Sequence, residues 1–404
     1  MSIRERMPRS DDCITERKLL LSATGAATKL LYVTTVDWYF LLHWMDRANA
    51  AQEAGYEIHL ALCITSSENL ELLESKGYYV HQIPFERGRP RILTELSCFW
   101  RCYLLLIRIR PEVCHALTIK PVAYIGIIQR LRNKAAILSL PGLGMMSRAT
   151  SLKGRLFWRI LKRLLALALA GKNKAMFETY ADIKSLIGGT SEAASRAILV
   201  PGAGVDLKCF KVLSAPEKGP IRVLFAGRLL RPKGLHNLVE AIRILKAKNV
   251  AVELHVAGII DQSSMVSIPI SEIEAWHKQS LIIWHGQVND MAGLISDSHI
   301  VALPTSYGEG IPRILIEAAA CGRPVIATYE SGCQEFVKDQ VDGYLVYPHD
   351  VLLLVESIEK LVYSPEIREN MGAAAREKVE KHYSNQCVID ITLACYDSLL
   401  ENNL

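Results

Sequence analysis

Two glutamates separated by seven residues, Glu309 and Glu317, mark the segment best suited to chemistry. Gly308 and Gly310 flank the first glutamate and allow the backbone to approach a ligand closely. Pro312 is predicted in the first turn of the following helix, whose free N–H groups can receive a phosphate oxygen or a carboxylate. Glu317, one to two turns into that helix, can accept hydrogen bonds from vicinal hydroxyls such as those of ribose. We therefore expect a sugar and a nucleotide along one helix start.

A second candidate group consists of two cations, Arg228 and Lys233, which follow a predicted strand and precede a predicted helix. Open α/β sheets bind ligands beyond the carboxyl ends of their strands, and two cations there suit two phosphates. They would stabilise charge on a leaving nucleoside diphosphate and take the place of a metal. The alternative is a pair of solvated surface cations. Because no Asp-x-Asp motif stands in a credible site, we expect neither a metal nor a cofactor.

The pattern of elements predicts two α/β domains, each with a parallel, doubly wound sheet. Strands and helices alternate from residue 29 onward, a Gly/Pro/Ser-rich linker spans 199–220, and a second alternation follows. The predicted strands are 29–35, 57–62, 113–117, 221–226, 252–257, 281–284, 300–303 and 324–328, and the predicted helices are 41–54, 93–109, 121–131, 152–170, 235–248, 311–320 and 385–400. We divide the chain into a polar extension (1–27), an N-terminal domain (28–200), a C-terminal domain (201–384) and a terminal helix (385–404) returning towards the N-terminal domain.

Charge is distributed unevenly along the 404 residues, although the net charge is only +5. Between Arg101 and Lys174, fifteen basic residues accompany a single acidic residue, Glu112. This stretch lacks a zinc-finger spacing and an RNA-binding aromatic motif, so we expect an anionic membrane surface rather than nucleic acid. The predicted helix 152–170 would lie on it with Phe157 and Trp158 at the interface; an ordinary surface helix is the alternative.

The cellular location is predicted from features that the sequence lacks, namely a signal peptide and a membrane-spanning segment. Residues 1–27 contain acidic residues and no continuous apolar run, so they do not resemble a signal peptide. No stretch of about 18 residues is free of charge, which predicts peripheral attachment rather than a membrane span. The ten cysteines form no CxxC pair and are interpreted as reduced, small apolar side chains. We expect a cytoplasmic protein attached to the inner face of the cytoplasmic membrane.

The segment from Glu309 to Glu317, with the flanking Gly-Ile-Pro and Glu-Ala-Ala-Ala-Cys-Gly-Arg-Pro, resembles the signature of the family-four retaining glycosyltransferases of GT-B fold. The likeness is greatest to bacterial N-acetylgalactosaminyl-type transferases that extend undecaprenyl-diphosphate-linked glycans. It extends over nearly the whole chain after residue 28 through the motifs Leu117-Thr-Ile-Lys-Pro121, Gly142-Leu-Gly144, Pro201-Gly-Ala-Gly-Val-Asp206, Gly227-Arg-Leu-Leu-Arg-Pro-Lys-Gly234 and Ser331-Gly-Cys-Gln-Glu335.

The resemblance implies roles on the donor side of the site. Arg228 and Lys233 would grip the donor diphosphate, and Glu309 would bind donor-sugar hydroxyls as the central catalytic residue. The other implied donor-binding residues are Gly308, Gly310, Ile311 and Glu317. Retention would proceed through a short-lived oxocarbenium ion pair, with the departing phosphate assisting deprotonation of the acceptor. A covalent nucleophile, by analogy with retaining glycosidases, is the alternative for Glu309.

On the N-terminal side, the resemblance places His115 near the donor sugar as a second catalytic residue and Lys120 near the acceptor diphosphate. A structural histidine satisfied by its neighbours and a helix-capping lysine are the alternatives. Gly142 and Gly144 offer a turn without side chains across the cleft for the acceptor, or a plain turn. Aromatic residues 38–40 with His43 could line an acceptor mouth or pack in the core.

Together these features predict a retaining, metal-independent transferase that moves a sugar from a nucleotide sugar, expected to be UDP-linked, to a polyprenyl-diphosphate-linked glycan acceptor. The expected context is bacterial surface polysaccharide assembly, such as O-antigen or capsule. The competing interpretation is a catalytically silent subunit that binds nucleotide sugar within a membrane glycan-assembly complex.

Overall fold

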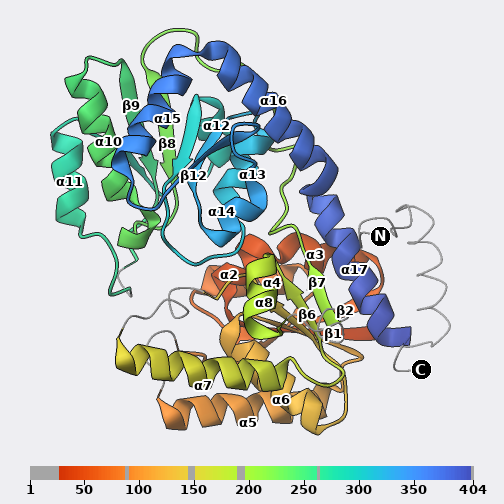
Figure 1. Ribbon diagram of the computed structural model, residues 1–404. Coiled ribbons are helices and arrows are strands. Elements are labelled where there is room, and N and C mark those ends of the chain that lie inside the picture. The colour runs from red at the N-terminus through yellow and green to blue at the C-terminus, as the bar shows by residue number, and fades with distance from the viewer. Residues whose placement is uncertain (1–26, 87–90, 144–150, 189–195, 262–263, 402–404) are drawn as a thin grey trace.

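Two parallel sheets form the framework of the molecule in the computed structural model, which describes residues 27–86, 91–143, 151–188, 196–261 and 264–401 (Figure 1). The N-terminal sheet has seven strands in the order β3-β2-β1-β4-β5-β6-β7, and the C-terminal sheet has six in the order β10-β9-β8-β11-β12-β13. Within the described residues, all neighbouring strands of both sheets pair in parallel. The predicted α/β class with two doubly wound domains is therefore confirmed.

The N-terminal domain alternates strands with helices that cover both sheet faces. Its strands are β1 (Thr28–Val36), β2 (Tyr56–Cys63), β3 (Tyr79–Gln82), β4 (Val113–Leu117), β5 (Ile137–Leu140), β6 (Lys174–Phe177) and β7 (Ala197–Leu199). Its helices are α2 (Asp37–His43), α3 (Met45–Glu53), α4 (Ser67–Ser75), α5 (Ile92–Ile109), α6 (Ile119–Leu131), α7 (Leu152–Ala168) and α8 (Tyr180–Leu186). The central strands are almost wholly buried because both faces are covered.

The C-terminal domain repeats this construction. Its strands are β8 (Ile221–Ala226), β9 (Val252–Ala257), β10 (Ile283–Gly286), β11 (Ile300–Leu303), β12 (Val325–Thr328) and β13 (Gly343–Val346). A 3₁₀ turn, η3 (Arg231–Lys233), precedes the helices α10 (Leu235–Ala247), α11 (Ile270–Lys278), α12 (Met291–Ser296), α13 (Arg313–Ala320), α14 (Ser331–Phe336), α15 (Val351–Tyr363) and α16 (Pro365–His382).

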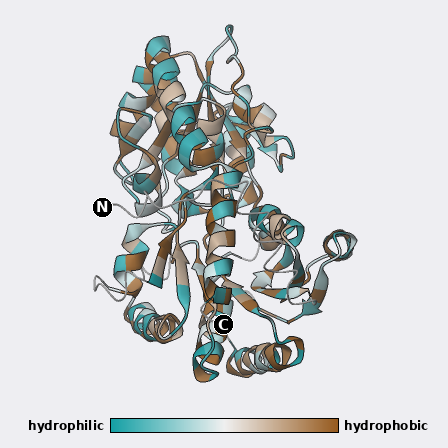
Figure 2. Ribbon diagram, turned by 90° about the vertical axis from the view of Figure 1, so that its right-hand side faces the viewer, coloured by the Kyte–Doolittle hydropathy of each residue, from teal (hydrophilic) through white to brown (hydrophobic). Residues whose placement is uncertain are grey.

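The chain crosses between the domains near Val205 and Ser384, which form an isolated parallel bridge. Helix α17 (Asn385–Glu401) then lies along the N-terminal domain, where it contacts α3 and β4 (Figures 1 and 2). Five of its residues are buried in the N-terminal core: Val388, Leu393, Cys395, Tyr396 and Leu399. The C-terminal segment thus belongs to the packing of the first domain.

Two predicted boundaries differ in ways that affect the site. The helix expected over 41–54 is two helices, α2 and α3, broken at Trp44, whose φ of −127° is not helical. The helix expected from Ile311 begins at Arg313, with Pro312 as its N-cap rather than a first-turn residue. The break at Trp44 separates the cleft-facing end of α2 from α3.

Candidate functional site

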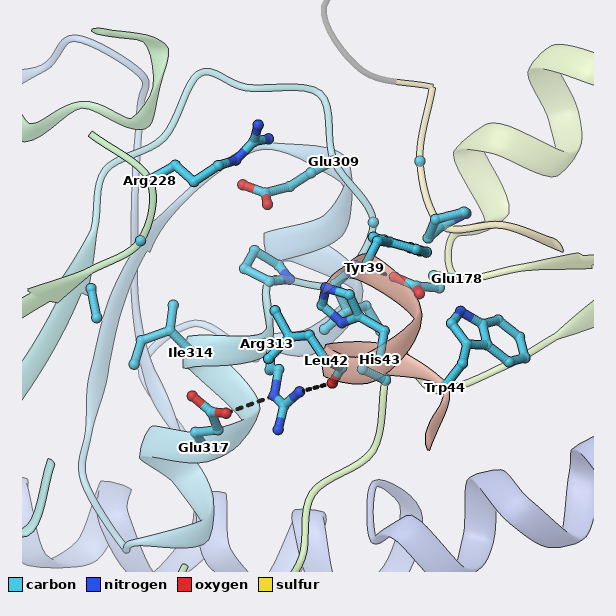
Figure 3. A pocket seen from close by; sticks show the side chains of 18 of the residues that line it. Tyr39, Leu42, His43, Trp44, Glu178, Arg228, Glu309, Arg313, Ile314 and Glu317 are labelled. Carbon is cyan, nitrogen blue, oxygen red and sulfur yellow. Dashed lines mark hydrogen bonds and ion pairs between the residues drawn. The ribbon is translucent and has the colours of Figure 1, made fainter. Parts of the chain in front are cut away.

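A cavity of about 1080 Å³ lies between the two domains and is lined by residues of both (Figure 3). The C-terminal domain contributes the end of β8, the segment 288–292, the loop after β11 and the start of α13. The N-terminal domain contributes α2, the start of α6 and the loops after β5 and β6. These are the carboxyl ends of parallel strands, where ligands bind in open α/β sheets.

Lys233 and Glu309 form the central charged pair of the C-terminal wall. The Lys233 Nζ donates to Glu309 Oε1 at 2.5 Å and Oε2 at 2.6 Å. Lys233 is only 8% exposed and ends η3, whereas Glu309 stands in the loop between β11 and α13. The next residue, Gly234, has φ of 83°, and a Cβ there would lie 1.9 Å from Pro304 O. This glycine therefore allows η3 to lie against the loop that carries Glu309.

Arg228 lies at the rim of the same wall, just after β8. Its guanidinium donates from Nη1 to Asp261 Oδ2 at 3.2 Å, and the side chain is 40% exposed. An ion pair this exposed is weakly held, so the guanidinium can exchange its partner for a phosphate. Arg228 and Glu309 point towards one another in Figure 3.

Glu317 lies deeper along α13, buried to 8% exposure. Its Oε1 accepts from Arg313 Nε at 2.7 Å, and the Arg313 Nη1 also donates to the Leu42 carbonyl of the N-terminal domain. Burial raises the pKa of Glu317, while the Arg313 guanidinium lowers it. The carboxyl is thus positioned by an arginine that joins α13 to α2.

The loop around Gly310 touches the N-terminal domain through backbone atoms. A Cβ on Gly142 would lie 2.5 Å from Gly310 N, and one on Gly310 would lie 2.0 Å from Pro141 O. The Gly142 φ of 147° also disfavours a side chain. Gly308, Gly310 and Ile311 line the cavity with Glu309. Gly142 lines it as well and packs against the loop 304–312 that carries Glu309; Gly144 lies outside the described residues.

His115 does not line the cavity. It lies within β4, 0% exposed, with Nδ1 2.8 Å from Tyr396 Oη and Nε2 2.7 Å from Ser139 Oγ. The Tyr396 hydroxyl in turn lies 2.8 Å from Tyr32 Oη. This corrects the expectation of a histidine beside the donor sugar: both ring nitrogens are used in a buried network that fastens α17 to the sheet.

Lys120 does line the cavity, but its ammonium is already bonded. Nζ donates to Glu95 Oε1 at 2.6 Å and to Glu86 O at 2.8 Å. Lys120 is the second residue of α6, and these contacts link it to α5 and to the segment after β3. An anionic ligand reaching it would share the ammonium with Glu95.

Sequence reasoning missed several residues of the N-terminal wall, of which Glu178 and Arg47 are the most notable. Glu178 follows β6 directly, a strand-end position that could have signalled a site residue. Burial raises its pKa to about 8, against the opposing effect of Arg47. Arg47 is 6% exposed, donates to Gly202 O at 2.9 Å and lies over the Trp44 ring.

Tyr39 and His43 of α2 also line the cavity, whereas Phe40 is fully buried in the core. Burial, together with the smaller effects of Arg313, Arg47 and Arg228, lowers the pKa of His43 to about 3. The expectation of an aromatic mouth thus applies to one face of α2, and the other face packs internally.

The described residues include no group of three or more His, Cys, Asp or Glu side chains arranged to hold a metal ion. No helix in the described part of the chain is long and apolar enough to cross a membrane.

Two facing α/β domains with a ligand cleft between their strand ends define the GT-B class of proteins. Solved structures agree: sucrose-phosphate synthase from Thermosynechococcus elongatus superposes with a TM-score of 0.74 at 18% identity, covering 93% of this chain and all of that one. Anabaena HepE in complex with UDP-glucose gives 0.69 at 18% identity, covering 91% and 99%.

Sequence comparison identifies the family. Residues 210–378 match the model of the glycosyl transferases group 1, and residues 29–179 match the glycosyl transferase 4-like model. The capsular polysaccharide biosynthesis glycosyltransferase CapM of Staphylococcus aureus is 25% identical over 84% of this chain and 90% of its own length. The chain therefore belongs to the group 1 glycosyltransferases, with a glycosyltransferase 4-like N-terminal domain.

Proposed function

We propose that this glycosyltransferase transfers a sugar, with retention and without a metal, from a UDP-sugar to a lipid-linked glycan acceptor in bacterial surface polysaccharide assembly. The observation that carries the proposal is the juxtaposition of Lys233, Glu309 and Arg228 at the start of α13. Cations and a helix start there suit a diphosphate, and a carboxylate beside them suits sugar hydroxyls.

The donor diphosphate would lie between Arg228 and Lys233. Both cations have carboxylate partners in the unliganded protein, Asp261 and Glu309, so phosphate oxygens would join or replace these partners. Charge-assisted hydrogen bonds from two cations stabilise the negative charge that grows on the leaving nucleoside diphosphate. This is the physical basis for proposing that no metal is needed.

The rest of the donor would follow the loop and α13. Glu309 would accept hydrogen bonds from the transferred sugar, the backbone of Gly308, Gly310 and Ile311 would lie against it, and Glu317 would bind ribose hydroxyls. The buried, arginine-bound position of Glu317 favours a fixed hydrogen-bonding role. UDP is proposed because HepE, a structural neighbour, was solved with UDP-glucose.

In the reaction, the bond between the sugar anomeric carbon and the phosphate oxygen would break first. The acceptor hydroxyl oxygen would then bond to the same face of that carbon, and its proton would pass to the departing phosphate. Glu309 would stabilise the short-lived cation through its negative charge, without bonding to it.

The acceptor would occupy the N-terminal wall, with its diphosphate near Lys120 and its sugar near Gly142. A lipid-linked glycan is proposed because CapM, which aligns over most of both chains, is a capsular polysaccharide biosynthesis enzyme. The wall's aromatic and titratable side chains, among them Tyr39 and His43, would contact the acceptor sugar.

Membrane attachment would use the two amphipathic helices α5 and α7, which lie at the end of the N-terminal domain farthest from the C-terminal domain (Figures 1 and 2). Both expose large apolar side chains: Ile92, Leu93, Leu96, Trp100, Leu104 and Ile107 on α5, and Leu152, Leu156, Phe157, Ile160, Leu164 and Leu167 on α7. Lys153, Arg155, Arg159, Lys162 and Arg163 accompany them on α7. Trp158, expected at the interface, instead packs against the domain core.

Transfer is tested by measuring nucleotide release from a panel of UDP- and GDP-sugars in EDTA, with and without a polyprenyl-diphosphate-linked sugar. Wild type should release UDP from one donor in an acceptor-stimulated manner, Glu309→Ala should not, and the exposed-site control Glu377→Ala should match wild type. Release only after metal addition would refute metal independence. Binding of UDP without release from any donor would favour the silent subunit.

Membrane binding is tested by flotation with vesicles of phosphatidylglycerol and phosphatidylcholine. Replacing Arg155, Arg159 and Arg163 by Glu should weaken binding to anionic vesicles at least about a hundredfold, since each basic residue contributes about 1 kcal/mol. The same change at Arg243, Lys248 and Lys278, exposed in the C-terminal domain, is the matched control and should have little effect. An equal loss of vesicle binding in both triple variants would show that net charge, and not the position of the three arginines on α7, determines binding.

A further inference from the structure

Glu178 makes a direct contact between the domains at the loop 304–312, which is called the donor loop here because the proposed function places the donor sugar against it. It stands immediately after β6 in the N-terminal domain, and its Oε2 accepts a hydrogen bond from the Ile311 N–H of the C-terminal domain at 2.9 Å. Ile311 is two residues beyond Glu309 and directly precedes Pro312, the N-cap of α13. The carboxyl therefore touches the chain between the proposed sugar-binding carboxylate and its supporting helix.

The neighbouring backbone contacts leave this segment little freedom to move independently. A Cβ on Gly310 would lie 2.0 Å from Glu178 Oε2 and from Pro141 O, and one on Gly332 would lie 1.9 Å from Gly310 O. Gly310 is thus held between the N-terminal domain on one side and α14 of its own domain on the other. The segment is fixed only while both sides are present.

The start of α13 lacks a local partner of this kind. Pro312 caps the helix without a side-chain hydrogen bond, and no acidic residue stands in the first turn. A backbone N–H near a helix start that has no partner in its own segment needs an oxygen acceptor from elsewhere, and a carboxyl oxygen can accept whether it is ionised or protonated. Here that group comes from the other domain.

The surroundings of Glu178 support a specific role for it. The charged and titratable groups that act on it are Arg47 of α3, Asp182 of α8 and Glu309, and it acts in turn on Tyr39 of α2. A part-buried carboxyl next to two other carboxylates is unfavourable unless its hydrogen bond is useful. The hydrogen bond from the Ile311 N–H to Glu178 is the favourable interaction that the structure shows at this position.

We propose that Glu178 is a positioning residue that holds the segment 309–311 from the opposite domain, so that Glu309 reaches its donor-facing position only when the domains are in contact. The proposal deepens the proposed function and rests on it. Contact between the domains would then affect the reaction, because the N-terminal domain would place the sugar-binding carboxylate of Glu309. The proposed diphosphate-binding cations, Arg228 and Lys233, belong to the C-terminal domain alone.

The test compares Glu178→Ala and Glu178→Gln with wild type. Asp46→Asn serves as control, because Asp46 Oδ2 accepts from Asn385 Nδ2 at 2.7 Å between α3 and the start of α17, away from the donor loop. Hydrogen exchange at the Ile311 amide reports the contact without any substrate. Calorimetry with UDP reports nucleotide binding, and acceptor-stimulated nucleotide release gives kcat and KM.

In Glu178→Ala, exchange at Ile311 should rise at least about tenfold because the amide loses its partner. The kcat should fall roughly 10- to 100-fold, as expected for a misplaced catalytic group, while the Kd for UDP changes less than about threefold. Glu178→Gln keeps an oxygen acceptor and should restore most of the kcat and of the amide protection. Asp46→Asn should resemble wild type in all three measurements.

Two results would overturn the proposal: unchanged exchange at Ile311 in Glu178→Ala, or a kcat within about twofold of wild type despite faster exchange. A Gln variant as impaired as the Ala variant would also contradict it. If wild type transfers no sugar, the proposed function fails, and the exchange measurement still decides whether Glu178 holds the segment.

Discussion

The two walls of the cleft carry their ionisable groups in different states. On the C-terminal wall, Arg228 and Lys233 each form an ion pair with a carboxylate. On the N-terminal wall, burial lowers the pKa of His43 to about 3 and raises that of Glu178 to about 8. Arg47 and Lys120 of the same wall donate to the Gly202 carbonyl and to Glu95, whereas Arg228 on the opposite wall is 40% exposed.

Under the proposed function, this difference divides the work of binding between the walls. The proposed donor diphosphate needs cations that can change partners, as the partly exposed Arg228 can. The hydroxyls of the proposed acceptor glycan need polar partners in a surface with little water, such as Tyr39 and His43 of the N-terminal wall. The Gly142 and Gly310 contact joins the two walls without a side chain between them.

The largest effect is expected at the centre of the charged wall. Lys233→Ala removes the cation that pairs with Glu309, and kcat/KM for the donor should fall by about 10³-fold, as for loss of a preorganised electrostatic group. Steady-state nucleotide release measures it, with Lys248→Ala on the same domain's surface as the control. A loss below about threefold would remove Lys233 from the donor site.

The junction between the walls comes next. Gly142→Ala adds a Cβ 2.5 Å from Gly310 N at a φ of 147°, so the walls must separate. We expect kcat to fall roughly 10- to 100-fold with UDP affinity nearly unchanged. Kinetics and UDP calorimetry measure the two effects. A weakened UDP affinity with unchanged kcat would instead make Gly142 part of nucleotide binding.

His115 should affect stability rather than chemistry. His115→Ala leaves the buried Ser139 hydroxyl without its partner and weakens the attachment of Tyr396, at a cost of about 2 kcal/mol, or roughly 4–8 °C in Tm. Differential scanning calorimetry measures the shift, and UDP affinity should stay as in wild type. A variant with unchanged Tm and a large loss of kcat would show that His115 acts in catalysis and not only in stability.

The smallest effect is expected in the pH dependence of thermal stability, through Glu178 on the N-terminal wall. Because the folded-state pKa of Glu178 is raised to about 8, its proton stabilises the fold at low pH, and this contribution is lost as pH rises through about 8. Glu178→Gln cannot lose a proton, so its Tm should gain on that of wild type between pH 6 and pH 9 by a few degrees, roughly 2–4 °C. Parallel Tm curves across that range would show that Arg47 keeps Glu178 ionised.

Much of the donor wall could be predicted from the sequence because its parts are local. Glu309 and Glu317 share one loop and helix, and Arg228 and Lys233 share one strand-to-helix turn. Each group lies at a strand end, so parallel pairing of β8 with β11 alone brings the two together. All four residues line the cleft.

The acceptor wall could not be predicted in the same way. Its residues come from α2, α3, α6 and the segments after β5 and β6; the sequence pointed to Lys120 and Gly142 but not to Arg47 or Glu178. His115 illustrates the limit of this reasoning. The resemblance placed it near the cleft, but α17 packs on this domain and the Tyr396 hydroxyl is hydrogen-bonded to the His115 Nδ1. Which face of β4 a side chain takes, and what covers that face, depends on contacts distant in sequence.

Hydrophobic periodicity and strand-end position are local properties, so the sequence alone was enough to predict the two parallel-sheet domains and the cations and carboxylates of the C-terminal wall. The break of α2 from α3 at Trp44, the internal role of His115 and the place of Glu178 against Ile311 were visible only in the folded structure. They depend on contacts within and between the domains, and the free energy of such contacts belongs to pairs of residues far apart in the chain.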